Sequence, residues 1–111
     1  MQIDQIDEVR AMRALGGRLY EEFLRKPSMS AGLYELPAGS VDPQQPHTED
    51  ELYFVIAGCA TFECSGKRRP VGPHETIFVE AHAPHRFVDI TADLTVLVVF
   101  APAKSSGVAG A

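Results

Sequence analysis

The sequence lacks a surplus of basic residues and any long apolar run. Lysine and arginine together number 10 against 15 aspartates and glutamates, which gives a formal net charge of −5. A nucleic-acid-binding surface normally needs the opposite balance, so we expect no DNA or RNA partner. The longest apolar run, residues 96–101, is far shorter than the ~20 residues that span a bilayer, and the first ten residues are acidic rather than a basic signal. We therefore expect no membrane association and a cytoplasmic location.

Cysteine is also scarce. Cys59 and Cys64 lie five residues apart in one strand-like segment, so their side chains should point to opposite faces. The pair does not have CxxC spacing, and no export signal precedes it. We expect two reduced thiols that carry no chemistry.

The length and composition predict one folded domain. A chain of 111 residues is too short for two separate cores, and 45% hydrophobic with 23% charged residues is typical of a globular protein. Apolar side chains recur at steps of three residues over residues 1–15, which predicts a short helix that Asp4 or Asp7 is able to cap. Residues 18–26 fit either a helical turn or a strand, and we favour the strand.

Most of the remaining chain has the pattern of short strands. Segments rich in aromatic and β-branched residues alternate with Gly, Pro and Asp punctuation, which is typical of a sandwich or barrel. The predicted strands are residues 28–36, 51–57, 60–64, 76–79, 84–89 and 94–100. The basic residues 67–69 between them are interpreted as a solvated hairpin turn rather than an anion site. We divide the chain into an amino-terminal extension (1–27), a β-barrel (28–102) and a flexible tail (103–111).

One predicted strand indicates a partner. Residues 94–100, LTVLVVF, are apolar on both faces, so both faces should be covered. A small barrel cannot cover its own outer face, which leaves the amino-terminal segment or a second copy of the protein. We favour the second copy and therefore a homodimer.

All four histidines lie in two short windows beside strand ends, and an acidic group, residues 49–51, lies in the first. On a straight strand the backbones of His47 and Glu51 would be ~13 Å apart, at the limit for two side chains sharing one ion at ~2.1 Å. The polar residues 48–50 suit a bend in which His47 closes one strand and Glu51 opens the next, with both side chains turned inward. His85, at the start of another strand, is placed to supply a third ligand from across the barrel.

These residues resemble the two motifs of the cupin superfamily, as found in germins and small single-domain bacterial cupins. The first motif runs Gly, five residues, His-x-His, three or four residues, Glu, six residues, Gly. The positions that fall on this spacing are Gly39, Gln45, His47, Glu51 and Gly58. Gln45 stands where the family has its first histidine.

The second motif is less complete. The family pattern is Gly, five residues, Pro-x-Gly, two residues, His, three residues, Asn, and the matching positions are His74, Glu80, His82, His85 and Asp89. Only His85 is retained. Because a turn position filled by glycine often needs positive φ, we expect backbone strain at His82. The resemblance covers about residues 28–102 and implies an all-β double-stranded β-helix, the cupin jelly-roll barrel, with a short helical or strand extension.

The resemblance implies one divalent transition metal per chain, usually iron, manganese, nickel, copper or zinc in the family. Carried over by position, its ligands are His47, Glu51 and His85. Gln45 is either a fourth ligand or, as we favour, a hydrogen-bonding partner of a metal-bound water. Glu49 lies two residues from both His47 and Glu51, so Glu49 and Gln45 are our candidates for handling or orienting a proton.

Tyr53, Val55, Phe78 and Phe87 are expected to be core residues, and those that face the cavity would also form a substrate wall. The resemblance implies a metalloenzyme, dioxygenase-like, that acts on a small oxygenated organic molecule. The alternative is a non-catalytic module that binds a sugar or an organic acid, with or without metal. In a metal-free module the two histidines and the glutamate would form a structural polar network.

Overall fold

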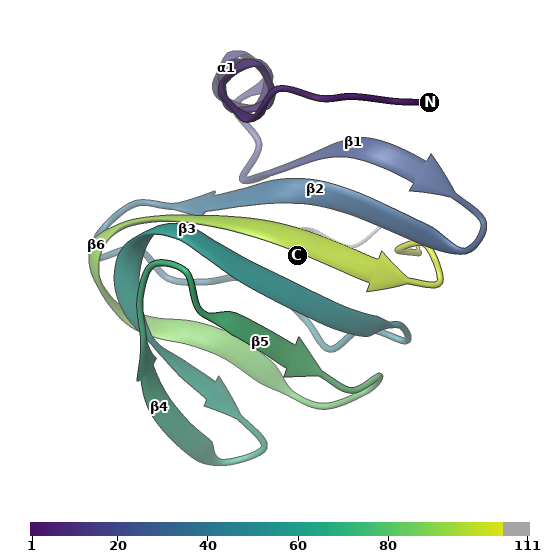
Figure 1. The fold of residues 1–111 in the computed structure, drawn as a ribbon. Coiled ribbons are helices and arrows are strands. Elements are labelled where there is room, and N and C mark those ends of the chain that lie inside the picture. Colours follow the sequence, from purple (N-terminus) through teal and green to yellow (C-terminus); the bar gives the residue numbers. More distant parts are fainter. Residues whose placement is uncertain (106–111) are drawn as a thin grey trace.

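A curled antiparallel sheet with a helix beside it makes up the protein (Figure 1). The computed structural model describes residues 1–105. Its elements are α1 (Ile6–Gly16), β1 (Tyr20–Lys26), β2 (Met29–Leu36), β3 (Asp50–Cys64), β4 (Lys67–Val71), β5 (Thr76–Val79) and β6 (His85–Ala101). The strand order is β1-β2-β6-β3-β4, and β5 pairs with β3. The predicted all-β architecture with an amino-terminal helix is confirmed, and α1 is too short to cross a membrane.

The long strands β3 and β6 each run through both halves of the barrel. Residues 50–57 of β3 pair with residues 95–101 of β6, and residues 59–64 pair with residues 85–92. The register is irregular where these two halves meet. The sequence analysis divided each of these strands into two, because a bend inside a strand carries the same Gly and Asp signals as a turn between strands.

Gly58 occupies the bend of β3. Its φ is 96°, and a Cβ atom built there would lie 2.3 Å from the carbonyl oxygen of Asp93 and 2.6 Å from the Cα of Leu94. The backbones of β3 and β6 therefore approach so closely at the bend that only glycine fits. This close approach explains why the last position of the first motif is glycine in this chain.

The core fills the inside of the curled sheet and follows the alternation of each strand. On β3 the inward residues Tyr53 and Val55 are fully buried. Leu52 precedes Tyr53 and points to the opposite face of the sheet, where it is 43% exposed. The buried apolar cluster consists of Tyr34, Leu36, Tyr53, Val55, Ala60, Phe62, Val71, Val79, Phe87, Ile90, Leu94, Val96, Val98 and Phe100.

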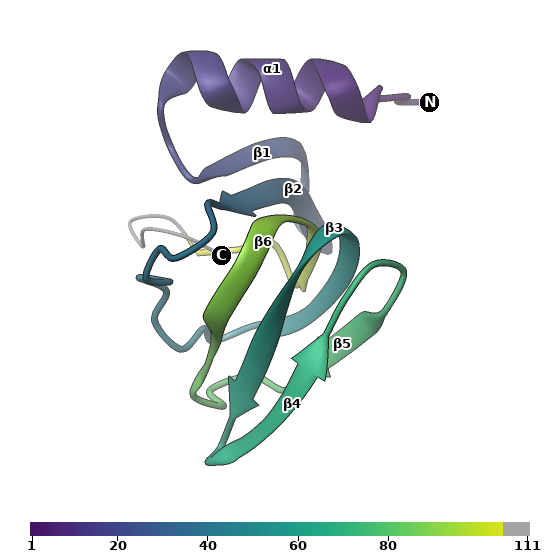
Figure 2. The same ribbon diagram turned by 90° about the vertical axis from the view of Figure 1, so that its left-hand side faces the viewer.

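Helix α1 lies across the outer side of β1 and β2 (Figures 1 and 2). The side chain of Gln5, rather than Asp4 or Asp7, caps it by accepting from the Glu8 amide, and the helix ends at Gly17 with φ 71°. The carboxylate of Glu35 on β2 anchors the helix. It accepts from Arg13 Nε at 2.8 Å and from Arg10 Nε at 3.2 Å.

Strand β4 was not predicted, because its basic residues 67–69 suggested a turn. The turn is confined to Ser65 and Gly66, and Lys67–Val71 then pairs with the second half of β3. Pro70 is tolerated because β4 is an edge strand of this sheet. The side chains of residues 67–69 are exposed.

Part of the expected flexible tail is held against the sheet. The Ala103 amide donates to the carbonyl of Pro27, and the Lys104 amide donates to the Ser30 hydroxyl at 2.8 Å. Lys104 is buried. Residues 106–111, also assigned to that tail, lie outside the described residues.

Substituting Gly58→Ala should destabilise the protein by about 3 kcal/mol or more, because the added methyl group meets the backbone of β6. The matched control is Gly17→Ala, which has a similar positive φ but no atom within 4 Å of the new Cβ. That control should cost only about 1 kcal/mol. Equal losses in urea unfolding would show that the close approach at the bend is unimportant.

Glu35 should make the stability depend on pH. Burial alone would raise the pKa of Glu35, but the hydrogen bonds from Thr95 and Arg13 and the charge of Arg10 outweigh it and hold the pKa below its usual 4.5. The stabilisation is therefore present above pH 4.5 and is lost as the pH falls through the lowered value.

We expect Glu35→Gln to cost about 1–2 kcal/mol at neutral pH, a cost that shrinks in acid. Urea unfolding at neutral pH and at a pH below the lowered pKa of Glu35 measures the loss of stability. Glu22→Gln, which removes an exposed pair with Arg25, is the control and should change the stability by less than about 0.5 kcal/mol. A Glu35→Gln cost that is the same at both pH values would contradict this account.

Candidate metal centre

Three side chains from distant parts of the chain meet inside the barrel. His47 lies in the loop before β3, Glu51 is near the start of β3, and His85 is the first residue of β6. All three are buried, with exposures of 5%, 1% and 7%. One potential ligand atom from each lies within 4.8 Å of the others. These are the three residues that the sequence analysis assigned to a metal.

The chain bends between His47 and Glu51, as the spacing predicted. Residues 48 and 49 form the bend and β3 begins at residue 50, so both side chains turn inward. His47 itself lies in the loop and does not close a strand, which corrects that detail of the prediction. Its carbonyl accepts from the His82 amide at 2.6 Å, so the turn before β6 holds the backbone of His47 in place.

The turn that contacts His47 is strained. His82 has φ 68°, which confirms the expected left-handed conformation at a position where the family has glycine. His74, at the other glycine position of that motif, has φ 71° and stacks on Phe54. The backbone of the second motif is therefore kept although its glycines are absent.

His85 forms hydrogen bonds through both ring nitrogens. Nδ1 is 2.7 Å from the carbonyl oxygen of Ala83, and Nε2 is 2.9 Å from Oε1 of Glu51. Because a carbonyl only accepts, Nδ1 carries a proton, and the hydrogen bond from Nε2 to a Glu51 carboxylate needs a second proton on Nε2. A metal bound at Nε2 would take the place of that second proton. Burial lowers the pKa of His85, but the hydrogen bonds to Glu51 and Ala83 outweigh it and leave the pKa raised.

The donor set suits a divalent cation. Oε2 of Glu51 is buried and has no hydrogen-bond partner among the described residues. Within residues 1–105, three carboxylates are buried, Asp42, Glu49 and Glu51, against one buried lysine, Lys104. With both histidines neutral, as metal ligands are, the formal charge of these four side chains is −2, from three negative charges and one positive, which one dication would balance.

The distances also allow an ion to be shared. Two ligand atoms that each bind at ~2.1 Å are at most about 4.2 Å apart. The observed spread of 4.8 Å therefore requires side-chain shifts of no more than about 1 Å. His47, Glu51 and His85 thus fit a mononuclear centre with two imidazoles and one carboxylate, the donor set of non-haem iron(II) oxygenases.

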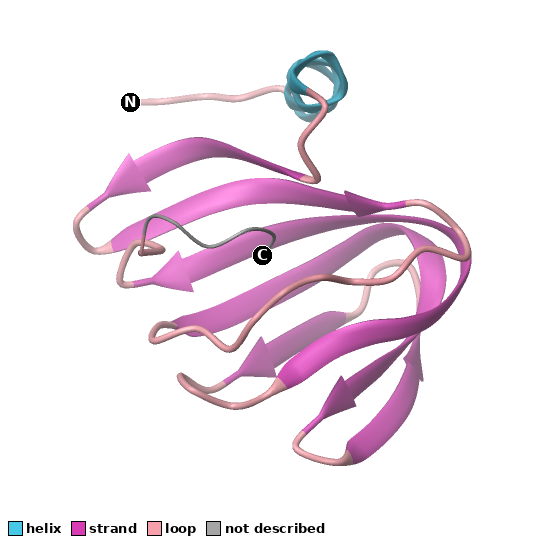
Figure 3. Cartoon of the chain, turned by 180° about the vertical axis from the view of Figure 1, so that it is seen from behind, coloured by secondary structure: helices cyan, strands magenta, loops and turns pink. Residues whose placement is uncertain are grey.

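Asp42 anchors the long loop between β2 and β3, which runs across the barrel in Figure 3. Its buried carboxylate accepts from the Tyr34 hydroxyl, from the Gln44 side-chain amide and, at 2.9 Å, from the Phe87 amide of β6. These bonds fix the loop that carries His47 onto the strand that carries His85. The sequence analysis did not identify Asp42, because no motif position marks it.

The glutamine that faces the interior is Gln44 and not Gln45. Gln45 is exposed, so the expectation that it borders the cluster is corrected. Gln44 is buried, and its Oε1 accepts from the Tyr53 hydroxyl at 2.8 Å. Burial, together with the charge of Glu51, raises the pKa of Tyr53 well above its usual value, so its hydroxyl stays protonated. Motif spacing does not show which of two adjacent side chains the loop turns inward.

Glu49 is buried, but it lies outside the group of three ligands. Its Oε2 accepts from the hydroxyls of Thr48 and Ser105. Burial would raise the pKa of Glu49, yet these hydrogen bonds and the nearby His47 lower it. The carboxylate is therefore ionised at neutral pH and tied to the carboxyl-terminal segment.

The expected substrate wall is present only in part. Tyr53, Val55 and Phe87 are buried, and the Tyr53 ring centroid lies 6.1 Å from that of His85. Phe78 is 60% exposed and points away from the interior, which corrects its assignment. Side chains alternate along β5, and Val79, which is 2% exposed, occupies the inward position.

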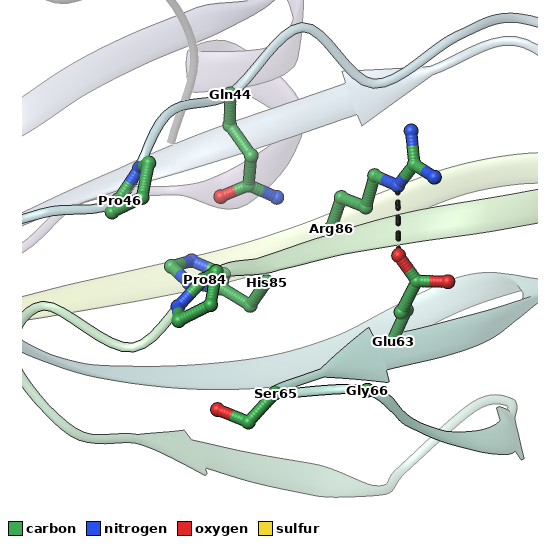
Figure 4. Close-up of a pocket in the computed structure, with 8 residues that line it drawn as sticks. All are labelled: Gln44, Pro46, Glu63, Ser65, Gly66, Pro84, His85 and Arg86. Atoms are coloured by element: carbon green, nitrogen blue, oxygen red, sulfur yellow. Dashed lines mark hydrogen bonds and ion pairs between the residues drawn. The ribbon is translucent and has the colours of Figure 1, made fainter.

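A pocket of about 210 Å³ reaches His85 from the surface (Figure 4). It is lined by Gln44, Pro46, Glu63, Ser65, Gly66, Pro84, His85 and Arg86. At about 30 Å³ per water molecule it holds roughly seven waters, which is room for a small organic molecule. His85 is the one member of the cluster among these lining residues.

Comparisons with known proteins find relatives in sequence and in fold. An uncharacterized protein of Streptomyces coelicolor is 42% identical over 105 residues, which is 95% of this chain and 100% of that protein. Dimethylsulfoniopropionate lyase DddQ of Ruegeria pomeroyi is 36% identical over 59 residues, 52% of this chain and 29% of the lyase. The crystal structure of that lyase superimposes with a TM-score of 0.64 at 30% identity, over 68% of this chain and 39% of the lyase.

A further solved structure, TT1209 of Thermus thermophilus, has a TM-score of 0.74 over 93% of this chain and 99% of that one. At 21% identity it supports the fold alone. Residues 32–100 match the cupin domain family. The chain therefore belongs to the cupin family, and its fold is the jelly-roll β-barrel of that family.

Proposed function

We propose that this cupin holds one divalent transition metal on His47, Glu51 and His85 and acts there as an enzyme on a small oxygenated organic molecule. The observation that carries the proposal is the buried cluster itself, with a Glu51 oxygen that has no hydrogen-bond partner among the described residues. A buried ionised carboxylate is costly unless a cation or hydrogen bonds compensate it. The formal charge of the buried residues supports the same proposal.

The residues around the cluster have separate tasks. A divalent metal, when bound, would polarise an oxygen of the substrate or, as iron(II), activate dioxygen at its open positions. Asp42 and Gln44 hold the loop of His47, and the Tyr53 and Phe62 rings exclude water from one side of His85. Glu49, buried next to the cluster, is our candidate for accepting a proton, ahead of the exposed Gln45.

Two reaction classes follow from different observations. The two-histidine, one-carboxylate donor set favours a dioxygenase-like reaction. The similarity to dimethylsulfoniopropionate lyase favours an elimination instead, although the chain spans only 29–39% of that lyase. A cytoplasmic location stays a prediction from the sequence.

Metal content tests the proposal. Protein purified without an affinity tag should carry about one metal per chain, and added metal should raise the Tm by about 10 °C when it exceeds the Kd a hundredfold. His85→Ala should abolish both effects. The control His74→Ala removes a histidine outside the cluster and should retain the metal.

Less than about 0.2 metal per chain in the wild type, with no binding on titration, would contradict the proposal and leave the metal-free binding module. For loaded protein, dioxygen uptake with catechols, enediols, flavonols and thiols identifies an oxygenase. Cleavage of dimethylsulfoniopropionate without dioxygen uptake identifies a lyase.

We also propose a homodimer formed through the outer face of β3, β5 and β6. Helix α1 packs mainly on β1 and β2, away from this face. Leu52 and Phe78 are paired across β3 and β5 and are 43% and 60% exposed, and partly exposed Leu97 and Val99 continue the face on β6. An uncharged apolar face can pair with its own copy about a two-fold axis.

Phe78→Glu should convert the dimer to a monomer, because it places a charge in the centre of the apolar face. Light scattering after size-exclusion chromatography measures the mass, and circular dichroism verifies the fold. Leu15→Glu, at an 85% exposed position on α1, should leave the mass unchanged. A monomeric wild type would contradict the dimer.

A further inference from the structure

The pocket beside His85 is built from three separate segments. The loop before β3 supplies Gln44 and Pro46, the end of β3 and the turn after it supply Glu63, Ser65 and Gly66, and the start of β6 supplies Pro84, His85 and Arg86. Figure 4 shows these side chains around the opening. A molecule in this pocket would therefore contact the cluster through His85 and the rim through Arg86.

The rim of the pocket carries a shared ion pair. Glu63 accepts from Arg86 Nε at 3.0 Å and from Arg68 at 2.7 Å, so one carboxylate is shared by two guanidinium groups. Glu63 and Arg86 cancel formally, so the excess positive charge of these three side chains comes from Arg68, which lies beside the pocket and does not line it.

Arg86 retains free donors. Its Nε is used by Glu63, but within residues 1–105 its two terminal nitrogens have no hydrogen-bond partner. In Figure 4 these nitrogens lie on the side of the guanidinium group away from Glu63. A guanidinium edge with two unused nitrogens matches the two oxygens of a carboxylate, and such charge-assisted pairs are the strong hydrogen bonds of proteins.

We infer that the pocket binds a small carboxylate and that Arg86 is the residue that recognises its charge. This inference rests on the proposed function, since it names the substrate class of that site. Arg86 and His85 both line the pocket, Arg86 with its exposed side chain and His85 from the buried side, so a short molecule held by Arg86 would lie between the two residues. The pocket volume of about 210 Å³ has room for a carboxylate with a few carbon atoms beyond it.

Propanoate and its neutral isostere propanamide test the inference. Their affinities are measured by ¹H–¹⁵N chemical-shift titration of the full chain, once treated with chelator and once loaded with metal. The wild type should bind propanoate about tenfold more tightly than propanamide. Added salt should weaken the binding of propanoate and not that of propanamide.

Arg86→Gln should weaken propanoate binding about tenfold and leave propanamide binding unchanged. Arg86→Lys keeps the charge but loses the paired donors, so its affinity for propanoate should lie between those of the wild type and of Arg86→Gln. Arg69→Gln is the matched control, since it removes the same charge from exposed β4 without touching the pocket, and it should bind propanoate like the wild type.

Equal affinity of the wild type for both probes, or unchanged propanoate binding by Arg86→Gln, would overturn the inference. Failure of the proposed function is distinguishable from this. If no metal binds but propanoate binding still depends on Arg86, the carboxylate site stands and the metal centre falls. If Arg86→Gln keeps its metal and its propanoate affinity, the metal centre stands and the carboxylate site falls.

Discussion

The site depends on the fold-back of two paired strands. In the register of β3 with β6, His85 is opposite Cys64, which lies at the far end of β3 from Glu51. If the pair were straight, Glu51 and His85 would be about 40 Å apart. They are instead 2.9 Å apart, because both strands bend at Gly58 and the opposite residues of β6. The motif glycine therefore helps to bring Glu51 and His85 together although it is not a member of the cluster.

The second condition is electrostatic. A barrel of this size shields its interior from water, and the described part of this chain places three carboxylates there with one lysine. Each of the three is held differently: Asp42 by hydrogen bonds that tie the loop to β2 and β6, Glu49 by two hydroxyls and Glu51 by the ring of His85. Glu51 is thus the carboxylate with the most unused capacity, and it is also the one that faces both histidines.

Much of this arrangement follows from the sequence. The helix, the strands β2 and β5 and the grouping of His47, Glu51 and His85 were predicted, because alternation and ligand spacing are local patterns or match a family motif. Side-chain direction was predicted less well. Phe78 and Gln45 were both assigned one position away from the residue that faces inward, since a shift of one residue reverses the face.

Other features had no signal in one sequence. Strand β4 is basic and contains proline, so only its pairing with β3 reveals it as a strand. Asp42 lies in a loop, where aspartate is common because its side chain hydrogen-bonds the backbone of turns. Its role appears only in the folded chain, where Tyr34, Gln44 and Phe87 surround it. The meeting of Arg86, Arg68 and Glu63 likewise requires the register of three strands.

His74 and His82, whose backbones are left-handed, also affect the stage of folding at which their turns become ordered. A residue with a side chain visits fewer conformations in the unfolded chain than glycine does, but it needs more energy to enter the left-handed region. With His74 and His82 there, the turns of the second motif are set during folding and have little freedom left to lose afterwards. The protein thus gives up some stability in advance, and the turn of His82, which holds the backbone of His47, is in place before anything binds at the cluster.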